Sequence, residues 1–483
     1  MGQYTLISKV TKEQKLSWRL FLLFSVLVLS ILPLYRYQNY GGWPIGELVY
    51  DHTRLGKAFF ALEIPHTDPG VVASVSYLFD PFDLLIGAFG ALFGLRFAAL
   101  LLPSLLGIIT LILLYKIVSQ FLPSPQYHLL AGLFVLTNPV FLAVFSEATN
   151  LTVIATALTS GAYFFLRKDH LWKLSFLFFG LLFFYPLFHA LLAIPLLLML
   201  STAREKKKHA FILSLFLIAG IIISLFMKNN FFYISTPSLL SFIQQLFSDL
   251  GGKFGFSVFG MFLSLLGVFY LIEQKKITYS VIFSIIITLF FVTFISPVYS
   301  IYFLPLMSIA ATYGFFNLLN REWKLQPLQN MTLFLLILGV VFSGTSVISR
   351  NATASPSSEE ISALLWLQDN SYENAIILTS EKYAALTATV TERRVLLDRR
   401  SSMDPRYSDL TTDVENLYRT RKIDVATALL EKYQIDYIIV FSEMKQGLTW
   451  NSENEGLLFV LENGENFKKV FENNKVIIWS VYY

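Results

Sequence analysis

Two carboxylates and a guanidinium stand close together in the first long polar stretch of this sequence. The segment Gly46-Glu-Leu-Val-Tyr-Asp-His-Thr-Arg54 places Glu47, Asp51 and Arg54 three or four positions apart, so on a helix they share one face. A carboxylate can act as a general base or as a hard oxygen ligand for a metal ion. A guanidinium can bind a phosphate through charge-assisted hydrogen bonds. The segment therefore carries groups for acid–base work and for anion binding.

A helix is the natural element to position these groups. Pro44 is suited to the first turn of a helix, and Leu48, Leu55 and Phe59 then form an apolar face beside the polar one. A helix of this kind lies in the surface of a membrane. We predict such a helix within an outer loop that spans residues 36–83.

The rest of the chain is dominated by apolar runs. Of its 483 residues, 55% are hydrophobic and 14% are charged, against roughly 25% charged in soluble domains. Runs near the ~20 residues that cross a bilayer recur along the chain. They predict eleven spans, at residues 20–35, 97–115, 129–145, 151–166, 172–184, 187–201, 210–227, 255–272, 277–296, 301–319 and 331–349.

Basic residues give the orientation, because lysine and arginine are retained in cytoplasmic loops. They cluster at every second boundary, as at Lys206-Lys-Lys208 and Lys275-Lys276. The N-terminus is therefore expected on the cytoplasmic side of the cytoplasmic membrane. The tail after Arg350 is expected on its outer side. This pattern explains the net charge of +4 without any nucleic-acid partner. The chain has no cysteine, which excludes disulfides and thiolate metal sites.

A second domain is predicted from residue 351 to 483, where charged residues return. The multi-span domain then covers residues 1–350, and the later part is a small extracytoplasmic α/β domain. Its expected elements are a helix from Ser357 through Trp366, strands at 375–378, 395–397 and 437–441, a helix at 426–433 and a hairpin at 467–481.

The first loop resembles that of a known superfamily. Its motif from Pro44 to Arg54, followed by Ile64-Pro-His-Thr-Asp-Pro69, is similar to the corresponding loop of GT-C membrane glycosyltransferases. The likeness is closest to the catalytic subunits of archaeal oligosaccharyltransferases, and the chain also resembles protein mannosyltransferases. It implies an all-α domain of about eleven transmembrane helices, an inside N-terminus and an outer C-terminal domain.

The resemblance implies roles for the acidic residues. The acid of the family's first loop acts in catalysis, commonly with a divalent metal such as Mg or Mn, and corresponds here to Glu47. Asp51 is a second candidate for the base. The family's second acidic site lies in a short outer loop, which here is residues 145–150 with Glu147 as its only acid. Thr149 stands where a further ligand is usual. The implied metal ligands are therefore Glu47 and Glu147.

Further residues are candidates for substrate binding. Arg54 and Arg96 suit the phosphate of a lipid-linked donor, with His52 beside Arg54 in the motif. His189 lies at the outer end of its span, where related transferases place polar substrate contacts. Tyr299 occupies the region where relatives carry an arginine near the lipid phosphate.

The resemblance implies a glycosyltransferase that uses a polyprenyl-phosphate-linked sugar. The Trp-Trp-Asp-Tyr-Gly signature that reads the peptide acceptor is replaced by Thr379-Ser-Glu-Lys-Tyr383, so the acceptor stays open between protein, glycolipid and polysaccharide. Two alternatives remain. A lipid-linked sugar flippase would place ionisable groups at the bilayer midplane, and a non-catalytic scaffold displaying the C-terminal domain would need no acids in the loop.

Overall fold

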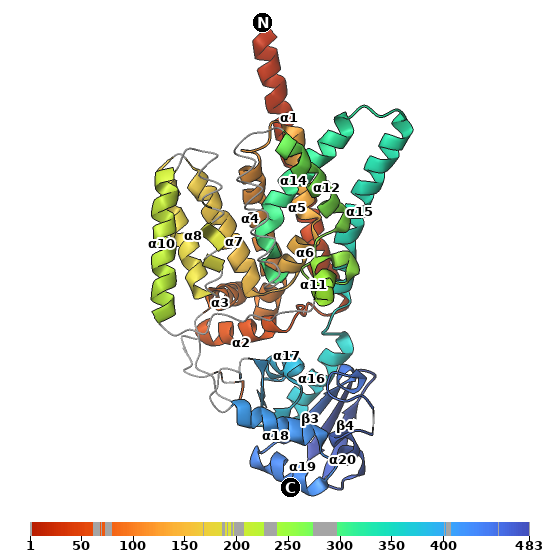
Figure 1. Cartoon of the computed structure of the whole chain (residues 1–483). Coiled ribbons are helices and arrows are strands. Elements are labelled where there is room, and N and C mark those ends of the chain that lie inside the picture. Colours follow the sequence, from red (N-terminus) through yellow and green to blue (C-terminus); the bar gives the residue numbers. More distant parts are fainter. Residues whose placement is uncertain are drawn as a thin grey trace. The chain divides into compact units, whose positions relative to one another are not determined.

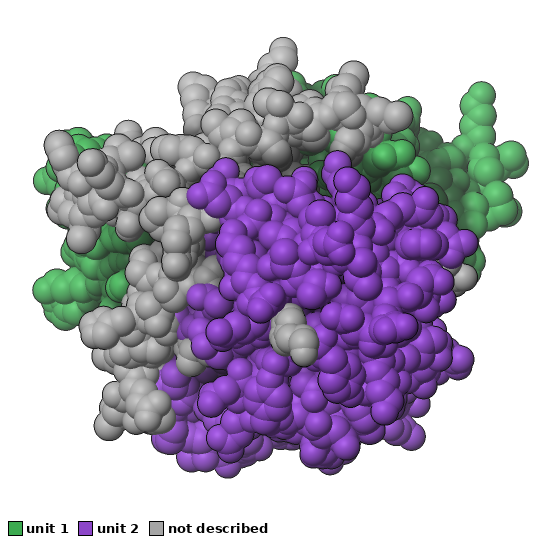
Figure 2. Space-filling view, turned by 90° about the horizontal axis from the view of Figure 1, so that it is seen from below, with its two compact units in different colours: residues 1–35, 101–352 green, residues 36–100, 353–483 purple. Residues whose placement is uncertain are grey.

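The computed structural model describes residues 2–60, 68, 70–72, 80–167, 169–185, 189–190, 192–194, 197, 207–226, 239–273, 297–399, 401, 407–452 and 454–482. The described chain is mostly helical, with one small mixed sheet near its C-terminus (Figure 1). It divides into two compact units, coloured separately in Figure 2. Unit 1 comprises Met1–Tyr35 and Leu101–Ala352, and unit 2 comprises Arg36–Leu100 and Thr353–Tyr483.

Unit 1 is built from helices. They are α1 (Gly2–Asn39), α4 (Leu95–Val118), α5 (Pro125–Leu136), α6 (Pro139–Ser146), α7 (Asn150–Leu166), α8 (Leu174–Gly180), α10 (Lys207–Phe226), α11 (Leu239–Leu246), α12 (Val258–Glu273), α14 (Leu304–Asn320) and α15 (Gln326–Ala352), with α1 and α4 continuing into unit 2. Short 3-10 turns join several of them, among them η2 (Leu181–Phe184) after α8 and η4 (Pro297–Phe303) before α14. Neighbours in sequence, such as α7 and α8, pack side by side (Figure 1).

Several of these helices can cross a membrane. Within the described residues, four are long and apolar enough, namely Lys15–Asn39, Leu95–Val118, Tyr299–Asn320 and Gln326–Ala352. The chain is therefore a multi-pass membrane protein. Shorter apolar helices cover other predicted spans, but residues 277–296 and most of 187–201 lie outside the described residues. The total of eleven spans stays a prediction.

The predicted span at 129–145 is a broken one. Helices α5 and α6 meet at an angle of 56°. Pro139 begins α6, and the side chain of Asn138 accepts a hydrogen bond from the amide of Val140 at 3.0 Å. A proline has no amide hydrogen to continue the preceding helix, so the chain caps a new helix here.

Close helix contacts in unit 1 depend on small residues. A Cβ atom on Gly267 of α12 would lie 1.8 Å from the carbonyl oxygen of Ala310 on α14, and one on Gly314 would lie 2.1 Å from that of Leu263. The backbones can approach this closely only because both positions are glycine.

The outer-loop part of unit 2 holds α2 (Leu48–Phe60) and α3 (Pro81–Phe93). Helix α2 starts later than Pro44 because Gly46 has a positive φ of 100°, which interrupts a right-handed helix. The carbonyl of Pro44 instead accepts a hydrogen bond from the Tyr50 hydroxyl at 2.8 Å. Glu47 therefore precedes the helix that it was predicted to share with Asp51.

The C-terminal part of unit 2 is an α/β arrangement. Its elements are α16 (Ser358–Asn370), β1 (Ile376–Leu378), α17 (Glu381–Thr391), β2 (Arg394–Val395), α18 (Tyr407–Arg419), α19 (Ile423–Lys432), β3 (Tyr437–Phe441), α20 (Leu457–Asn463), β4 (Phe467–Glu472) and β5 (Val476–Val481). The strand order is β2-β1-β3-β5-β4, with β1 parallel to both β2 and β3 and the last two pairs antiparallel.

The outer loop extends this sheet at the β2 edge. Val71 pairs in parallel with Val395. The amide of Val72 donates to the Val395 carbonyl at 2.9 Å, and the amide of Val395 donates to the Gly70 carbonyl at 2.9 Å. Residues 36–100 thus form one compact unit with the C-terminal residues, although the sequence groups them with the spans. The composition change near residue 350 coincides with the end of unit 1 at Ala352.

Candidate functional site

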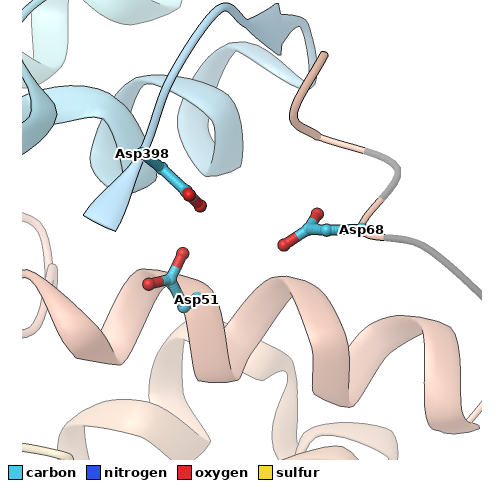
Figure 3. A group of neighbouring side chains, drawn as sticks. All are labelled: Asp51, Asp68 and Asp398. Atoms are coloured by element: carbon cyan, nitrogen blue, oxygen red, sulfur yellow. The ribbon is translucent and has the colours of Figure 1, made fainter. Parts of the chain in front are cut away.

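Three buried aspartates meet where the outer loop joins the C-terminal sheet. Asp51 comes from α2, Asp68 precedes the paired segment of the loop, and Asp398 follows β2 (Figure 3). One carboxylate oxygen from each lies within 4.8 Å of the others. Carboxylate oxygens are the donors that hard divalent cations take, so the group is consistent with a divalent-metal site.

Arg54 already neutralises much of this negative charge. Its Nη2 donates to Asp51 Oδ1 at 2.9 Å and to Asp68 Oδ2 at 2.6 Å, while its Nε donates to Asp68 Oδ1 at 2.9 Å. The same Nη2 lies 3.5 Å from Asp398 Oδ2. Burial lowers the pKa of Arg54, but Asp51 and Asp68 more than offset this, so the guanidinium stays charged.

Asp398 is the least satisfied carboxylate of the three. Its Oδ1 accepts a hydrogen bond from the Ser401 hydroxyl at 3.0 Å, whereas Oδ2 is buried without a hydrogen-bond partner among the described residues. Burial, followed by the charge of Asp51, raises the pKa of Asp398 from 3.8 to about 6. Sequence reasoning missed this residue. The available signal was its position directly after a predicted strand.

His52 points to a different neighbour. Its Nδ1 lies 2.6 Å from Asp83 Oδ1 on α3, and both side chains are buried. Two consecutive helix positions differ by about 100° around the axis, so His52 and Asp51 face different surroundings. The buried pair joins α2 to α3, and a role for His52 in substrate binding stays a prediction.

Glu47 is exposed, whereas Asp51, Asp68 and Asp398 are buried. Its charge acts on Tyr383, whose pKa is raised by burial first, then by Glu360, and to a smaller degree by Glu47. Glu47 thus lies within electrostatic range of the segment 379–383, where the family's acceptor signature would stand. The sequence alone did not predict an interaction between Glu47 and Tyr383.

Unit 2 also contains a pocket of about 470 Å³. Helix α2, the start of α4 and the segment from α17 to β2 contribute its walls. Arg54 and Arg96, both predicted from sequence, line it together. The guanidinium of Arg96 stacks over the Trp43 ring, 5.2 Å from its centroid.

The remaining predicted residues belong to unit 1. Glu147 caps the C-terminus of α6, is buried, and accepts a hydrogen bond from Lys253 at 2.9 Å. His189 Nδ1 lies 2.8 Å from the Tyr302 hydroxyl, and its ring is 5.3 Å from that of Tyr299. The partners Lys253 and Tyr302 were not predicted, because they are distant in sequence.

Glu47 and Glu147 belong to different compact units. Their convergence on one metal ion stays a prediction.

Comparisons by sequence return nothing for this chain. No protein-family model matches it, and no curated protein matches it.

Solved structures do match, at low identity. The archaeal oligosaccharyltransferase AglB from Archaeoglobus fulgidus, in complex with an inhibitory peptide and a dolichol-phosphate, is 14% identical over 89% of this chain and 70% of its own, with a TM-score of 0.57. ArnT from Cupriavidus metallidurans, bound to undecaprenyl phosphate, is 12% identical over 95% of this chain and 97% of its own, with a TM-score of 0.62. The mycobacterial arabinofuranosyltransferase AftD is 13% identical over 95% of this chain and 41% of its own, with a TM-score of 0.58.

These three proteins are GT-C membrane glycosyltransferases, and the resemblance predicted from the first-loop motif is confirmed at the level of the fold. The Archaeoglobus enzyme has also been solved in complex with Zn and sulfate.

Proposed function

We propose that this chain is a glycosyltransferase that moves a sugar from a polyprenyl-phosphate carrier to an acceptor at the outer face of the cytoplasmic membrane. The observation that carries the proposal is the GT-C fold shared over nearly the whole of both chains with ArnT, whose structure holds undecaprenyl phosphate. The AglB structure with dolichol-phosphate supports the same donor class.

The reaction requires a base and a place for negative charge. An oxygen of the acceptor attacks the anomeric carbon of the sugar, the bond from that carbon to the phosphate oxygen breaks, and the polyprenyl phosphate leaves with the bonding electrons. The acceptor proton passes to a carboxylate. Glu47 is the better base in this proposal, because it is exposed whereas Asp51 is buried and bonded to Arg54.

Arginine side chains can bind the departing polyprenyl phosphate. Arg54 and Arg96 line the same pocket, and the Nη1 of Arg54 is buried without a hydrogen-bond partner among the described residues. Guanidinium groups bind phosphate through charge-assisted hydrogen bonds. The aspartates around Arg54 hold its other nitrogens and so fix its orientation.

A divalent cation, Mg or Mn, belongs to the proposal as a cofactor. When bound, it would supply positive charge to the departing phosphate. Glu47 with Glu147 would hold it as the first-loop motif implies, and the three aspartates offer a second set of hard oxygen donors. In both sets a protein cation already contacts a carboxylate, Lys253 at Glu147 and Arg54 at the aspartates, so the ion has to compete with it.

Donor choice tests the proposal. Purified full-length protein in nanodiscs would receive a labelled sugar on a polyprenyl phosphate or on a nucleotide, with a membrane extract as the source of acceptors. We expect transfer from the lipid-linked donor alone, reduced by EDTA and restored by Mg or Mn. Transfer from the nucleotide donor alone would contradict the donor class. Movement of the intact lipid-linked sugar across the bilayer without transfer would favour the flippase.

A further inference from the structure

Four cationic residues stand at one end of neighbouring helices in unit 1. They come from the last turn of α4, the C-cap of α7, the 3-10 turn η1 (His170–Lys173) between α7 and α8, and the first turn of α10. Helices α7, α8 and α10 run side by side (Figure 1). The four residues, which we call the basic end of unit 1, are Lys116, Arg167, Lys173 and Lys208.

Tyr163 of α7 contacts two of these cations. The Lys116 ammonium lies over its ring, 5.6 Å from the centroid, and Arg167 Nη1 donates to its hydroxyl at 3.4 Å. Asp169 accepts hydrogen bonds from Arg167 at 3.3 Å and 2.5 Å. Arg167 is the only one of the four cations with an ion pair inside the described part of the chain. The three lysines, all exposed, therefore add positive charge that no ion pair with a described carboxylate offsets.

Trp172 of η1 makes a similar aromatic contact with α10. Its ring lies 4.3 Å from that of His209, in a T-shaped arrangement, and Lys208 directly precedes this histidine. The ring of Phe176 on α8 is 5.8 Å from that of Trp172. Tryptophan and tyrosine are enriched at the level of the lipid headgroups, because one end of each side chain is apolar and the other is polar. Tyr163 and Trp172 therefore indicate that the basic end lies at this level.

Exposed apolar side chains continue from the basic end along α8 and α10. Leu174 and Leu177 of α8 are exposed, as is Phe211 of α10. Leu174 directly follows Lys173, and Phe211 comes three residues after Lys208, less than one helical turn away. A water-soluble anion would contact the cations alone, whereas a phospholipid offers a phosphate to the cations and acyl chains to the apolar side chains. The combination favours a lipid.

We propose that the basic end of unit 1 binds an acidic phospholipid of the surrounding bilayer, with its headgroup among Lys116, Lys173 and Lys208 and its acyl chains along α8 and α10. Lysine ammonium groups bind phosphate as point charges on flexible stems. Basic clusters beside a membrane span attract acidic lipids in this way. The inference goes beyond the proposed function and does not rest on it, since no residue of the outer loop or of the C-terminal domain takes part.

Retention of defined lipids by the full-length protein tests this inference without any sugar transfer. The purified protein is exchanged into neutral detergent micelles with equal amounts of phosphatidylglycerol and phosphatidylcholine that carry the same acyl chains, and the lipid that stays bound is extracted and quantified. We expect phosphatidylglycerol to be enriched at least about 10-fold, because each lysine favours it about 5-fold. High salt should reduce the enrichment, because it screens exposed charges. Equal retention of the two lipids would overturn the proposal.

Lysine variants locate the site. Lys116→Gln, Lys173→Gln and Lys208→Gln should each lower the enrichment about 5-fold. Lys208→Arg keeps the charge and should retain phosphatidylglycerol as wild type does, which separates a loss of charge from a fault in folding. Lys324→Gln is the matched control, because Lys324 is an exposed lysine of unit 1 between α14 and α15, and it should also behave as wild type. Wild-type enrichment in all three glutamine variants would overturn the site.

Two further outcomes would contradict the proposal. An equal loss in the Lys324→Gln control would show that the lipid responds only to the total positive charge of unit 1. Tight binding of inorganic phosphate in the absence of phospholipid would show that the ligand is a water-soluble anion. The assay contains no polyprenyl phosphate, so its failure would leave the proposed function standing, and absence of sugar transfer would leave the lipid site standing.

Discussion

The charged residues of the two compact units are organised differently. In unit 2, Arg54 and three aspartates are all at most 9% exposed, and they bond across the junction of α2, the outer loop and β2. In unit 1, the pair between Glu147 and Lys253 has one buried member and one that is 57% exposed. The buried group of Arg54 and the three aspartates holds α2 to the segment after β2. In the half-exposed pair, another cation can replace Lys253 at Glu147. Asp51 and Arg54 thus belong to the buried group of unit 2, whereas Glu47 of the same motif is exposed.

Removing the central cation should have the largest effect on stability. Arg54→Met leaves the carboxylates of Asp51 and Asp68 buried without their cation, which typically costs about 3 to 5 kcal/mol. We expect amide hydrogen exchange in α2 to accelerate accordingly. The control Arg419→Met removes an arginine that is 83% exposed and should leave the exchange of α2 unchanged. Equal behaviour of the two variants would contradict a structural role for the buried cluster.

The pH dependence of unit 2 gives the next effect. The folded pKa of Asp398 is about 6, raised by burial and by Asp51 from 3.8, so the folded state binds the proton more tightly than the unfolded chain. The free energy of unfolding that this group contributes is therefore greatest below about pH 4 and is lost as the pH rises to about 6, by the order of 3 kcal/mol.

Asp398→Asn should remove this slope. The measurement is the opening free energy of β2 amides between pH 4 and 7, taken with EDTA so that no metal competes with the proton. The difference in pH dependence between wild type and variant gives the contribution of Asp398 alone, because the other carboxylates are present in both proteins. An identical slope in both proteins would show that this group does not titrate in the window.

The ion pair of unit 1 should be weaker. Lys253 is 57% exposed, so solvent screens its charge in this pair, and we expect Lys253→Met to cost about 1 kcal/mol. Hydrogen exchange at the start of α7 would report it. A loss as large as that of Arg54→Met would remove the contrast between the two units.

The smallest effect is expected at the rim of the pocket. Lys57 and Glu392 are 63% and 55% exposed, and exposed pairs contribute about 0 to 1 kcal/mol. Lys57→Gln should therefore leave the stability of α2 within about 1 kcal/mol of wild type, as measured by hydrogen exchange. A larger loss would mean that this pair, and not the buried cluster, holds the loop to the C-terminal domain.

Local patterns made much of unit 2 predictable. The helix expected from Ser357 is α16, where Ser357 and Glu360 form a capping box. The strand expected at 437–441 is β3, and the hairpin at 467–481 is β4 with β5. These elements follow from side-chain alternation and caps within a few residues, so the sequence contains them directly.

Contacts between distant segments could not be predicted in this way. The pairing of Val71 with Val395 joins positions more than 300 residues apart, and so does the approach of Asp398 to Asp51. Lys253 and Glu147 are 106 positions apart. Helices α17 and α18 were also missed. In α17 the apolar residues show no clear helical period, and in α18 the period is present but the apolar residues are few.

The most direct test of the account is sugar transfer by a Glu47→Gln variant. Glutamine keeps the size of the side chain and removes its charge, so the protein should fold and bind lipid phosphate while losing the base. Glu462→Gln, on an exposed glutamate of α20, is the matched control. In a purified assay with a polyprenyl-phosphate-linked donor, we predict a loss of about 100- to 10,000-fold for Glu47→Gln and wild-type rates for the control. Equal rates in the two variants would contradict a catalytic role for Glu47.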